Sequence, residues 1–281
     1  MINANNLSEL AVELLDRAKQ RGATEADVVV ADGENFSVQV RLSAVDRLTK
    51  AREKRLGLRV FFGKRSASAS TSDFSRDSLD ALVNDTCTLA AAVVEDPQSG
   101  LPDGDLLAAD LPDLDLYDPI SLETETQIEL ARRAEEAAMS ADARISNSEG
   151  ADFNSAGGRV VLANSHGFVG EYRSSSFSLS VSPIATAPDS DNMQRDYWYA
   201  AKRKYAALDS PESVGREAAR RTVRRLGAKK VATRRAPVVF DQEMAGSLLG
   251  NLCSAVSGYA LYKGASFLIN QLGKLIGPEI I

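Results

Sequence analysis

The chain has 281 residues, of which 44% are hydrophobic and 26% charged, with a formal net charge of −6. This is the composition of a globular protein with two or three domains, and it excludes a chain that is disordered throughout. The acidic, amphipathic N-terminus is not a secretory signal, no apolar stretch approaches the roughly 20 residues that cross a bilayer, and two isolated cysteines form no disulfide framework. We therefore expect a cytoplasmic protein with no membrane partner.

Residues 1–95 are predicted to form an N-terminal α+β domain. Apolar spacing predicts a helix over 7–22, with Asn6 as its cap, and a second helix over 75–94. Between these helices, apolar alternation or apolar runs predict strands over 26–31, 36–42, 44–54 and 56–63, followed by a hairpin partner over 64–74. Helices that flank a run of strands favour helices packed on one face of a mostly antiparallel sheet.

Residues 96–120 are predicted to be an acidic, proline-rich linker. Proline restricts its own backbone and that of the preceding residue, so no long helix is expected there. The stretch LPDLDLYDP (111–119) is predicted to be extended, with its Leu and Tyr side chains as anchors across the body of the protein.

Residues 121–235 are predicted to form a middle α+β domain. Helical patterns cover 121–141 and 211–228, and strand patterns cover 143–154, 158–163, 168–182 and 195–205. ANSHGF (163–168) is predicted to be a hairpin turn, and Gly157–Gly158 is also interpreted as a turn. A third unit begins near 236 with the strand-like APVVFD (236–241), followed by a helix over 247–258.

The sequence offers no familiar catalytic set. His166 is the one histidine, so the usual multi-histidine zinc sites cannot form, and as a turn residue it is expected to be simply exposed. Serines are abundant, but no Gly-x-Ser-x-Gly elbow marks any of them as a nucleophile. Cys253 has no cationic neighbour in sequence to activate it, so we interpret it as a buried small apolar residue and keep a Cys253 or serine hydrolase as a minor alternative.

Charge is unevenly distributed along the chain. Residues 95–152 contain 16 acidic and 3 basic residues, whereas residues 195–235 contain 13 basic and 4 acidic residues. On the second helix of the middle domain, Arg216, Arg220 and Arg224 share one face. The basic stretch Arg216–Arg235 raises the alternative of a nucleic-acid-binding or regulatory module, but it has no interleaved aromatic residues. We favour a solvated face that pairs with the acidic segment, and we do not expect nucleic acid as the partner.

Taken in order, these segments resemble those of the TldD/PmbA family, and most closely its PmbA branch, also called TldE. The resemblance rests on AVELLDRAKQRGATEADVVVADGENFSVQVR, LGLRVFFGKRSASASTSDFS, EDPQSGLPD, DLDLYDP, ANSHGF and VVFDQEMAGSLLGNLCSAVSGYALYKGASFL, which span essentially the whole chain. It implies a C-terminal β-rich domain, of which residues 236–281 would be only the start.

The resemblance also implies a function. In the TldD branch, the segment equivalent to 248–258 carries an HExxxH zinc motif and a further acidic ligand. Laid on this sequence, those positions fall at Gly250, Asn251, Ala255 and, for the later acid, near Ser257. The resemblance therefore implies no catalytic or metal-binding residue and no cofactor in this chain. Zinc is expected on a TldD-type protease subunit, the partner with which this chain would process unfolded peptides such as a microcin precursor or an antitoxin.

Two further expectations concern surfaces. Arg216, Arg220, Arg224 and His166 are candidates for contacts with the partner or for the lining of a peptide channel. The apolar residues within 237–281 are expected to lack a covering layer, so that the chain self-associates or leaves this stretch mobile.

Overall fold

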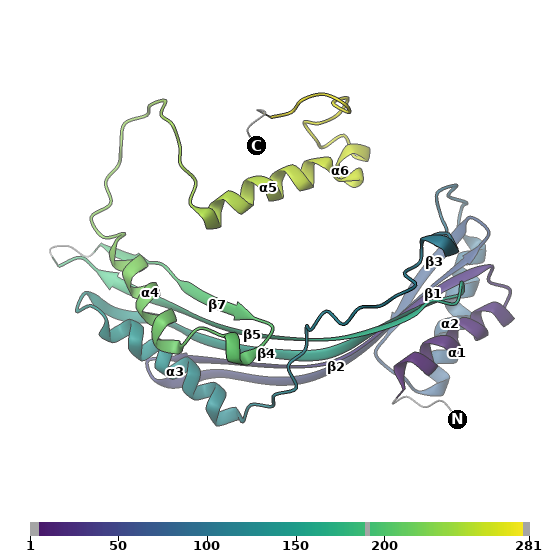
Figure 1. Cartoon of the computed structure of the whole chain (residues 1–281), viewed down its shortest axis with the longest axis horizontal. Coiled ribbons are helices and arrows are strands. Elements are labelled where there is room, and N and C mark those ends of the chain that lie inside the picture. Colours follow the sequence, from purple (N-terminus) through teal and green to yellow (C-terminus); the bar gives the residue numbers. More distant parts are fainter. Residues whose placement is uncertain (1–5, 189–191, 278–281) are drawn as a thin grey trace. The chain divides into compact units, whose positions relative to one another are not determined.

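The computed structural model describes residues 6–188 and 192–277, and the chain divides into two compact units, residues 1–228 and 229–281. Each unit is described by itself. Unit 1 is an antiparallel sheet with helices on it, and the described part of unit 2 is helical with irregular connections (Figure 1). The α+β class predicted from the sequence is confirmed.

The sheet of unit 1 is made of unusually long strands. They are β1 (Glu25–Arg41), β2 (Ala44–Phe62), β3 (Arg65–Thr71), β4 (Ile145–Asn164), β5 (Val169–Thr186), β6 (Met193–Arg195) and β7 (Trp198–Lys202). Their order is β3-β2-β1-β4-β5-β6, β7 also pairs with β5, and the pairings are antiparallel. β1, β2, β4 and β5 contain 17, 19, 20 and 18 residues. At the usual rise per residue, each extends roughly 55–65 Å.

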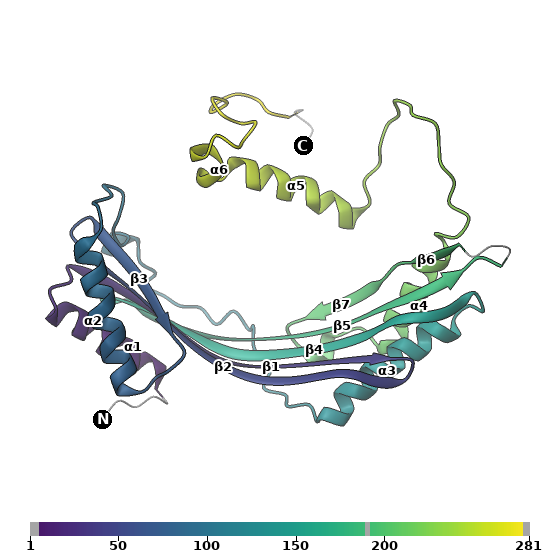
Figure 2. The same ribbon diagram turned by 180° about the vertical axis from the view of Figure 1, so that it is seen from behind.

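Helices cover the two ends of this sheet. α1 (Leu7–Gln20) and α2 (Arg76–Ala92) lie at one end, and α3 (Thr124–Ser140) and α4 (Pro211–Val223) lie at the other (Figures 1 and 2). Both pairs lie on the same face, because even-numbered side chains of β1 enter both cores. Val28 and Val30 belong to the core beneath α1 and α2, and Val38 and Val40 belong to the core beneath α3.

The helix ends follow the chemistry expected from their sequences. The Asn6 side chain accepts a hydrogen bond from the backbone N–H of Glu9 at 3.3 Å and so caps α1. Ser210 caps α4 in the same way, and Pro211 occupies the first turn, where its missing N–H costs no hydrogen bond. The helix predicted over 211–228 ends earlier, at Val223, and the last residues before Gly227 form turns.

The strands differ from the prediction in their continuity. The segments 26–31 and 36–42 form the single strand β1, and 143–154 and 158–163 form β4. Gly157–Gly158 is therefore not a turn but the middle of β4, opposite Glu34 and Gly33. A Cβ at position 158 would lie 2.7 Å from the carbonyl oxygen of Asp32, so glycine here permits a close approach of two strands.

The two expected α+β domains share this one sheet. β1 pairs with β4 from Asp27 opposite Asn164 to Val40 opposite Ala151, which joins residues 1–95 to residues 121–235 along most of both strands. The two helix-plus-sheet units are therefore two ends of one structure in space. We keep the division into 1–95, 96–120, 121–235 and 236–281 as a proposal about the sequence.

Unit 2 contains α5 (Gln242–Val256) and α6 (Gly258–Tyr262). The short turns η1 (Gly104–Leu106) and η2 (Tyr205–Ala207) lie in unit 1. The strand predicted at 236–241 is absent: these residues have no regular structure. Among the described residues of unit 2, only Ala255 and Leu268 are buried, and large apolar side chains such as Val239 and Leu249 are exposed. Within the described residues, no helix has the length and apolar character that crossing a membrane requires.

Candidate functional site

Between the two cores, the helix-bearing face of the sheet carries a row of charged side chains, which we call the central band. Its members follow from the strand register, because side chains directly opposite each other on neighbouring strands share a face. Asp32 lies opposite Lys54 and Arg159, Arg159 lies opposite Arg173, and the adjoining positions add Glu34, Arg52 and Lys50. Apolar side chains occupy the equivalent positions on either side, so the band separates the two cores.

Asp32 is the buried centre of this band. Asp32 is 8% exposed, and the Arg52 guanidinium donates hydrogen bonds to both oxygens of its carboxylate at 3.3 and 3.1 Å. The Arg159 guanidinium lies 4.0 Å from the same carboxylate. The hydrogen bond from Arg52 lowers the pKa of Asp32 against the opposing effect of burial. Asp32 therefore stays ionised near neutral pH and fixes the Arg52 side chain over the sheet.

A polypeptide segment crosses the sheet beside this band. We call residues 111–122 the strap. The strap is part of the connection between η1 and α3, which passes over the middle of the sheet (Figure 1). The Leu116 carbonyl accepts a hydrogen bond from the backbone N–H of Ser175 at 3.0 Å, on the edge of β5 that β7 leaves uncovered. The Ser175 hydroxyl accepts one from Asp118 N at 2.9 Å and donates one to the Arg203 carbonyl at 2.7 Å.

Acidic side chains of the strap are held by the segment that follows β7. Lys204 Nζ donates to Asp115 Oδ1 at 2.6 Å and also to the Tyr117 carbonyl. The Asp118 carboxylate accepts a hydrogen bond from Tyr205 N at 2.8 Å. Part of the acidic segment thus pairs with part of the basic segment, as the charge distribution predicted. The expectation that Leu and Tyr side chains anchor LPDLDLYDP is met by Leu111 and Tyr117, which lie against Gly170 and Gly157.

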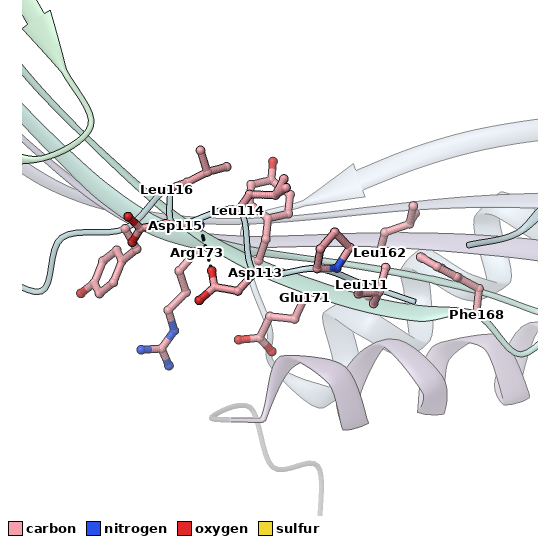
Figure 3. Close-up of a pocket in the computed structure, with 13 residues that line it drawn as sticks. Leu111, Asp113, Leu114, Asp115, Leu116, Leu162, Phe168, Glu171 and Arg173 are labelled. Atoms are coloured by element: carbon pink, nitrogen blue, oxygen red, sulfur yellow. Dashed lines mark hydrogen bonds between the residues drawn. The ribbon is translucent and has the colours of Figure 1, made fainter. Parts of the chain in front are cut away.

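Three neighbouring cavities meet at Tyr117. The largest, about 630 Å³, lies between the strap and β5 and is lined by the strap together with Leu162, Phe168 and residues 170–173. A second, about 480 Å³, lies over the central band, and a third, about 140 Å³, extends toward Phe36 and Gln127. Figure 3 shows Glu171 and Arg173 extending from β5 to the side on which α1 lies, while Leu162 and Phe168 mark the far end of the largest cavity.

This arrangement is suited to binding. Arg173 lies 5.9 Å from the Tyr117 ring centroid, and the band presents guanidinium and ammonium donors along an open surface. No histidine or cysteine lines any of the three cavities. Across residues 6–188 and 192–277, no three His, Cys, Asp or Glu side chains come close enough together to hold a metal ion.

The four positions aligned with the zinc motif lie at the end of α5 and just beyond it. Gly250 and Asn251 are exposed, Ala255 is 8% exposed, and Ser257 is both the C-cap of α5 and the N-cap of α6. Their side chains are hydrogen, amide, methyl and hydroxyl groups, none of which matches the imidazole and carboxylate ligands of a hydrolytic zinc site. Positions 250 and 255 are also offset by about 140° around an α-helix.

The three arginines of the predicted basic face of α4 have different surroundings. Arg220 binds Glu217 at 2.6 Å within the helix. Arg216 lines a cavity of about 400 Å³ between α3 and α4, together with the ion pair of Arg133 and Glu212. Arg224 is the C-cap residue of the helix. This pairing favours the interpretation of the stretch as a solvated face over that of a nucleic-acid groove.

His166 does not lie near these arginines. It lies in the turn between β4 and β5, at the sheet end covered by α1 and α2, whereas the arginines lie at the other end. His166 is exposed, as predicted, and its ring nitrogens also lie 3.1 Å from the Pro102 carbonyl and 3.1 Å from a Glu25 oxygen. The ring joins the start of β1, the hairpin turn and the connection that leads to the strap.

The cysteines also differ from the prediction. Cys253, interpreted as buried, is exposed on α5, and Cys87 lies on the buried face of α2. Burial raises the pKa of the Cys87 thiol, which disfavours the thiolate that a nucleophile needs. Neither cysteine lies in a constellation of the kind a cysteine hydrolase uses.

Sequence reasoning missed the central band altogether. Its members come from β1, β2, β4 and β5, and only the register of long strands brings them together. One signal was present: the even-numbered positions that are apolar at Val28, Val30, Val38 and Val40 continue through Asp32 and Glu34. A period-two pattern that persists through charged residues indicates one uninterrupted strand.

Comparison with protein families identifies three matching domain models. Residues 26–90 match the PmbA/TldA metallopeptidase domain 1, residues 117–226 match the central domain, and residues 233–281 match the C-terminal domain. All three domains of the family architecture are thus represented in the chain, the C-terminal one by residues 233–281.

Curated relatives are similar over most of this chain. The metalloprotease PmbA of Escherichia coli O157:H7 is 40% identical over 254 residues, which is 90% of this chain and 56% of the relative. The metalloprotease PmbA homolog of Haemophilus influenzae is 39% identical over 269 residues, which is 96% of this chain and 58% of the relative. The chain therefore spans a little over half the length of these relatives.

Solved structures share the fold. A protein of Bacteroides thetaiotaomicron described as a modulator of DNA gyrase superposes with a TM-score of 0.87 at 29% identity, covering 98% of this chain and 62% of that one. TldE from Thermococcus kodakarensis gives a TM-score of 0.72 at 15% identity, covering 92% and 57%, and at that identity it bears on the fold alone.

Proposed function

This chain belongs to the PmbA/TldD metallopeptidase family, and on that premise we propose that it is the non-catalytic, PmbA/TldE-like subunit of a zinc metallopeptidase complex. In this proposal a TldD-type subunit holds the zinc ion and cleaves peptides. The present chain supplies surface for the complex and for the peptide. The substrates are unfolded peptides of the microcin-precursor or antitoxin class.

The observation that carries the proposal is the chemistry of α5 at the aligned positions. Gly250 and Ala255 stand where histidines would ligate zinc, and Asn251 stands where a glutamate would act as the base. An amide at position 251 has no proton-accepting carboxylate. The residues present therefore do not fit a zinc ion, and no catalytic step is assigned to this chain.

A second observation supports a subunit role. Unit 2 exposes a run of large apolar side chains that its own fold does not cover; the most exposed are Val239, Tyr262 and Leu272. Contiguous apolar surface of this kind is rare on monomeric proteins and is a feature of association surfaces. Association with the TldD-type subunit is the proposal, and self-association is the alternative outcome.

Co-expression with the TldD-type protein of the same genome tests the proposal. We expect the two chains to elute together in size-exclusion chromatography and to cleave unstructured peptides only as a pair. Metal analysis of this chain purified alone should give no stoichiometric zinc. One tightly bound zinc per chain, or peptide cleavage by this chain alone, would overturn the non-catalytic role.

The control for complex formation is a change on the exposed apolar surface of α5. Leu249→Asp places a charge on a side chain that is 59% exposed, so it should leave unit 1 folded and weaken co-elution. A matched change on the other side of the same helix is Ser247→Asp, at an exposed position about 160° around the helix from Leu249, and it should have no effect. Equal co-elution of both variants with the partner would exclude α5 from the interface.

A further inference from the structure

The central band has an excess of positive charge that its own acidic residues do not balance. Lys50, Arg52, Lys54, Arg159 and Arg173 share the face with two carboxylates, Asp32 and Glu34, so the formal excess is three. Glu171 lies one position further toward α1 and accepts a hydrogen bond from Ser8 at 3.3 Å. Arg52, Arg159 and Arg173 line the cavity of about 480 Å³ over the band, and Lys50 lines the smaller cavity next to it.

The cations of the band are accessible as well as ordered. The Arg52 side chain is 67% exposed although Asp32 fixes its guanidinium, and Lys50 and Arg173 are exposed residues. A fixed and accessible guanidinium loses little conformational entropy when a carboxylate binds to it. The band thus differs from a scattered set of solvated surface charges, because the core on each side and the strap give it walls.

The strap shows which kind of ligand suits this surface. It is an extended, acidic, leucine-containing segment, and its bonds are the ones such a segment makes: a backbone carbonyl to the β5 edge at Ser175 and carboxylates to Lys204 and Tyr205 N. Along the described strap, that single backbone bond joins it to β5, and the largest cavity lies between the two. The protein itself thus places an extended acidic segment beside the central band.

We propose that the central band and the cavity over it bind an acidic segment of an extended polypeptide. Carboxylates of the ligand would pair with Lys50, Arg52 and Arg173. This inference rests on the proposed function, since it names a class of peptide that the complex would accept.

An acidic peptide fits better than a nucleic acid. Tyr117 is the one aromatic side chain lining the cavity over the band, whereas single-stranded nucleic-acid sites use several aromatic platforms.

Fluorescence anisotropy with the purified full chain and labelled peptides tests the proposal. The probe is a twelve-residue peptide, designed as about six Leu-Asp repeats, and its control is the same peptide with Asn in place of Asp. We expect salt-sensitive binding of the acidic peptide and at least about tenfold weaker binding of the amide peptide, because exposed charge pairs each contribute roughly two- to fivefold in affinity.

Matched variants locate the site. Lys50→Gln combined with Arg173→Gln should weaken binding by roughly tenfold by the same reasoning. Arg55→Gln removes a cation of the same strand β2 from the opposite face, since Arg55 lies opposite Ala31, and should change the affinity less than twofold. Circular dichroism melting of each variant shows that the fold is retained.

Each remaining outcome overturns the proposal. These outcomes are no binding of the acidic peptide, equal binding of the amide peptide, equal loss with Arg55→Gln, or tighter binding of a single-stranded oligonucleotide of matched charge. The assay contains neither zinc nor the second subunit. Its failure therefore leaves the proposed subunit role standing, and failure of co-elution with the TldD-type protein leaves peptide binding standing.

Discussion

Unit 1 and unit 2 are both rich in apolar residues, yet only unit 1 buries them. In unit 1, Phe153, Leu58 and Leu79 are at most 1% exposed, whereas in unit 2 Leu249 and Tyr259 are 59% and 73% exposed. The difference lies in what each apolar side chain meets. Four long strands and four helices supply two facing layers in unit 1, and a single helix with short extensions supplies one layer in unit 2. Apolar composition alone therefore does not make a core.

Protease sensitivity should separate the two units by the largest margin. Limited trypsin or subtilisin digestion is expected to cut first between Asp241 and Lys274 and to leave a stable fragment that ends near residue 228, because unit 2 has few buried contacts to oppose local opening. Mass spectrometry of the fragments checks this result. If the chain is monomeric and residues 241–274 resist digestion, unit 2 has a stabilising partner within the chain and the contrast between the units fails.

Removal of a large side chain should cost stability in one unit only. Phe153→Ala deletes a ring that is 0% exposed in the core beneath α3, and it should lower the free energy of unfolding by about 3–5 kcal/mol. Leu249→Ala in α5 is the matched change in unit 2 and should stay within about 0.5 kcal/mol. Urea unfolding followed by circular dichroism measures both. Similar losses in the two variants would mean that Leu249 is also buried.

A buried carboxylate sharpens the comparison for polar groups. Glu135 on α3 is 2% exposed and accepts hydrogen bonds from the backbone N–H groups of Leu42 and Ser43 at 3.0 and 2.9 Å, in the turn where both residues have positive φ. Glu135→Ala leaves these donors without their acceptor and should cost about 1–3 kcal/mol. The exposed neighbour Glu136→Ala is the control on the same helix. A loss of equal size in the control would contradict the assigned role.

The pH dependence of the central band is the smallest of these effects. Because Arg52 lowers the pKa of Asp32 below its unfolded value of about 3.9, the ionised carboxylate stabilises the fold above that pH. This contribution is lost as the pH falls through the folded pKa. The stability difference between wild type and Asp32→Asn should therefore be present at pH 7 and shrink below about pH 4. Urea midpoints at both pH values check it, and a constant difference would show that Asp32 does not act through its charge.

The sequence predicted the helices well because their signals are local. Asn6, Ser210 and Pro211 mark helix starts through contacts within one turn, and apolar spacing marks the buried face. The long strands were harder to predict, since DGEN (32–35) and Gly157–Gly158 are typical of turns and became strand interior only through pairing with each other. Tertiary pairing overrode local turn preference there.

The candidate site was less predictable than the fold for the same reason. Arg52 and Arg173 are 121 positions apart in the sequence and share a cavity only because β1 and β4 lie between their strands. No local pattern singles out either residue among the other arginines. The positions that correspond to the zinc motif of the TldD branch, by contrast, could be assigned from the family resemblance, because that motif lies within one short stretch of sequence.

The pairing of β1 with β4 also sets the order of events during synthesis of the chain. β1 ends at Arg41 and β4 begins at Ile145, so 103 residues separate the two strands. At the usual speed of translation, roughly 5–20 s pass between the emergence of one strand and that of its partner. During this interval β1, β2 and β3 can already form a ribbon, but one edge of β1 has no neighbour. On the nascent chain, this edge is the place most exposed to pairing with another copy.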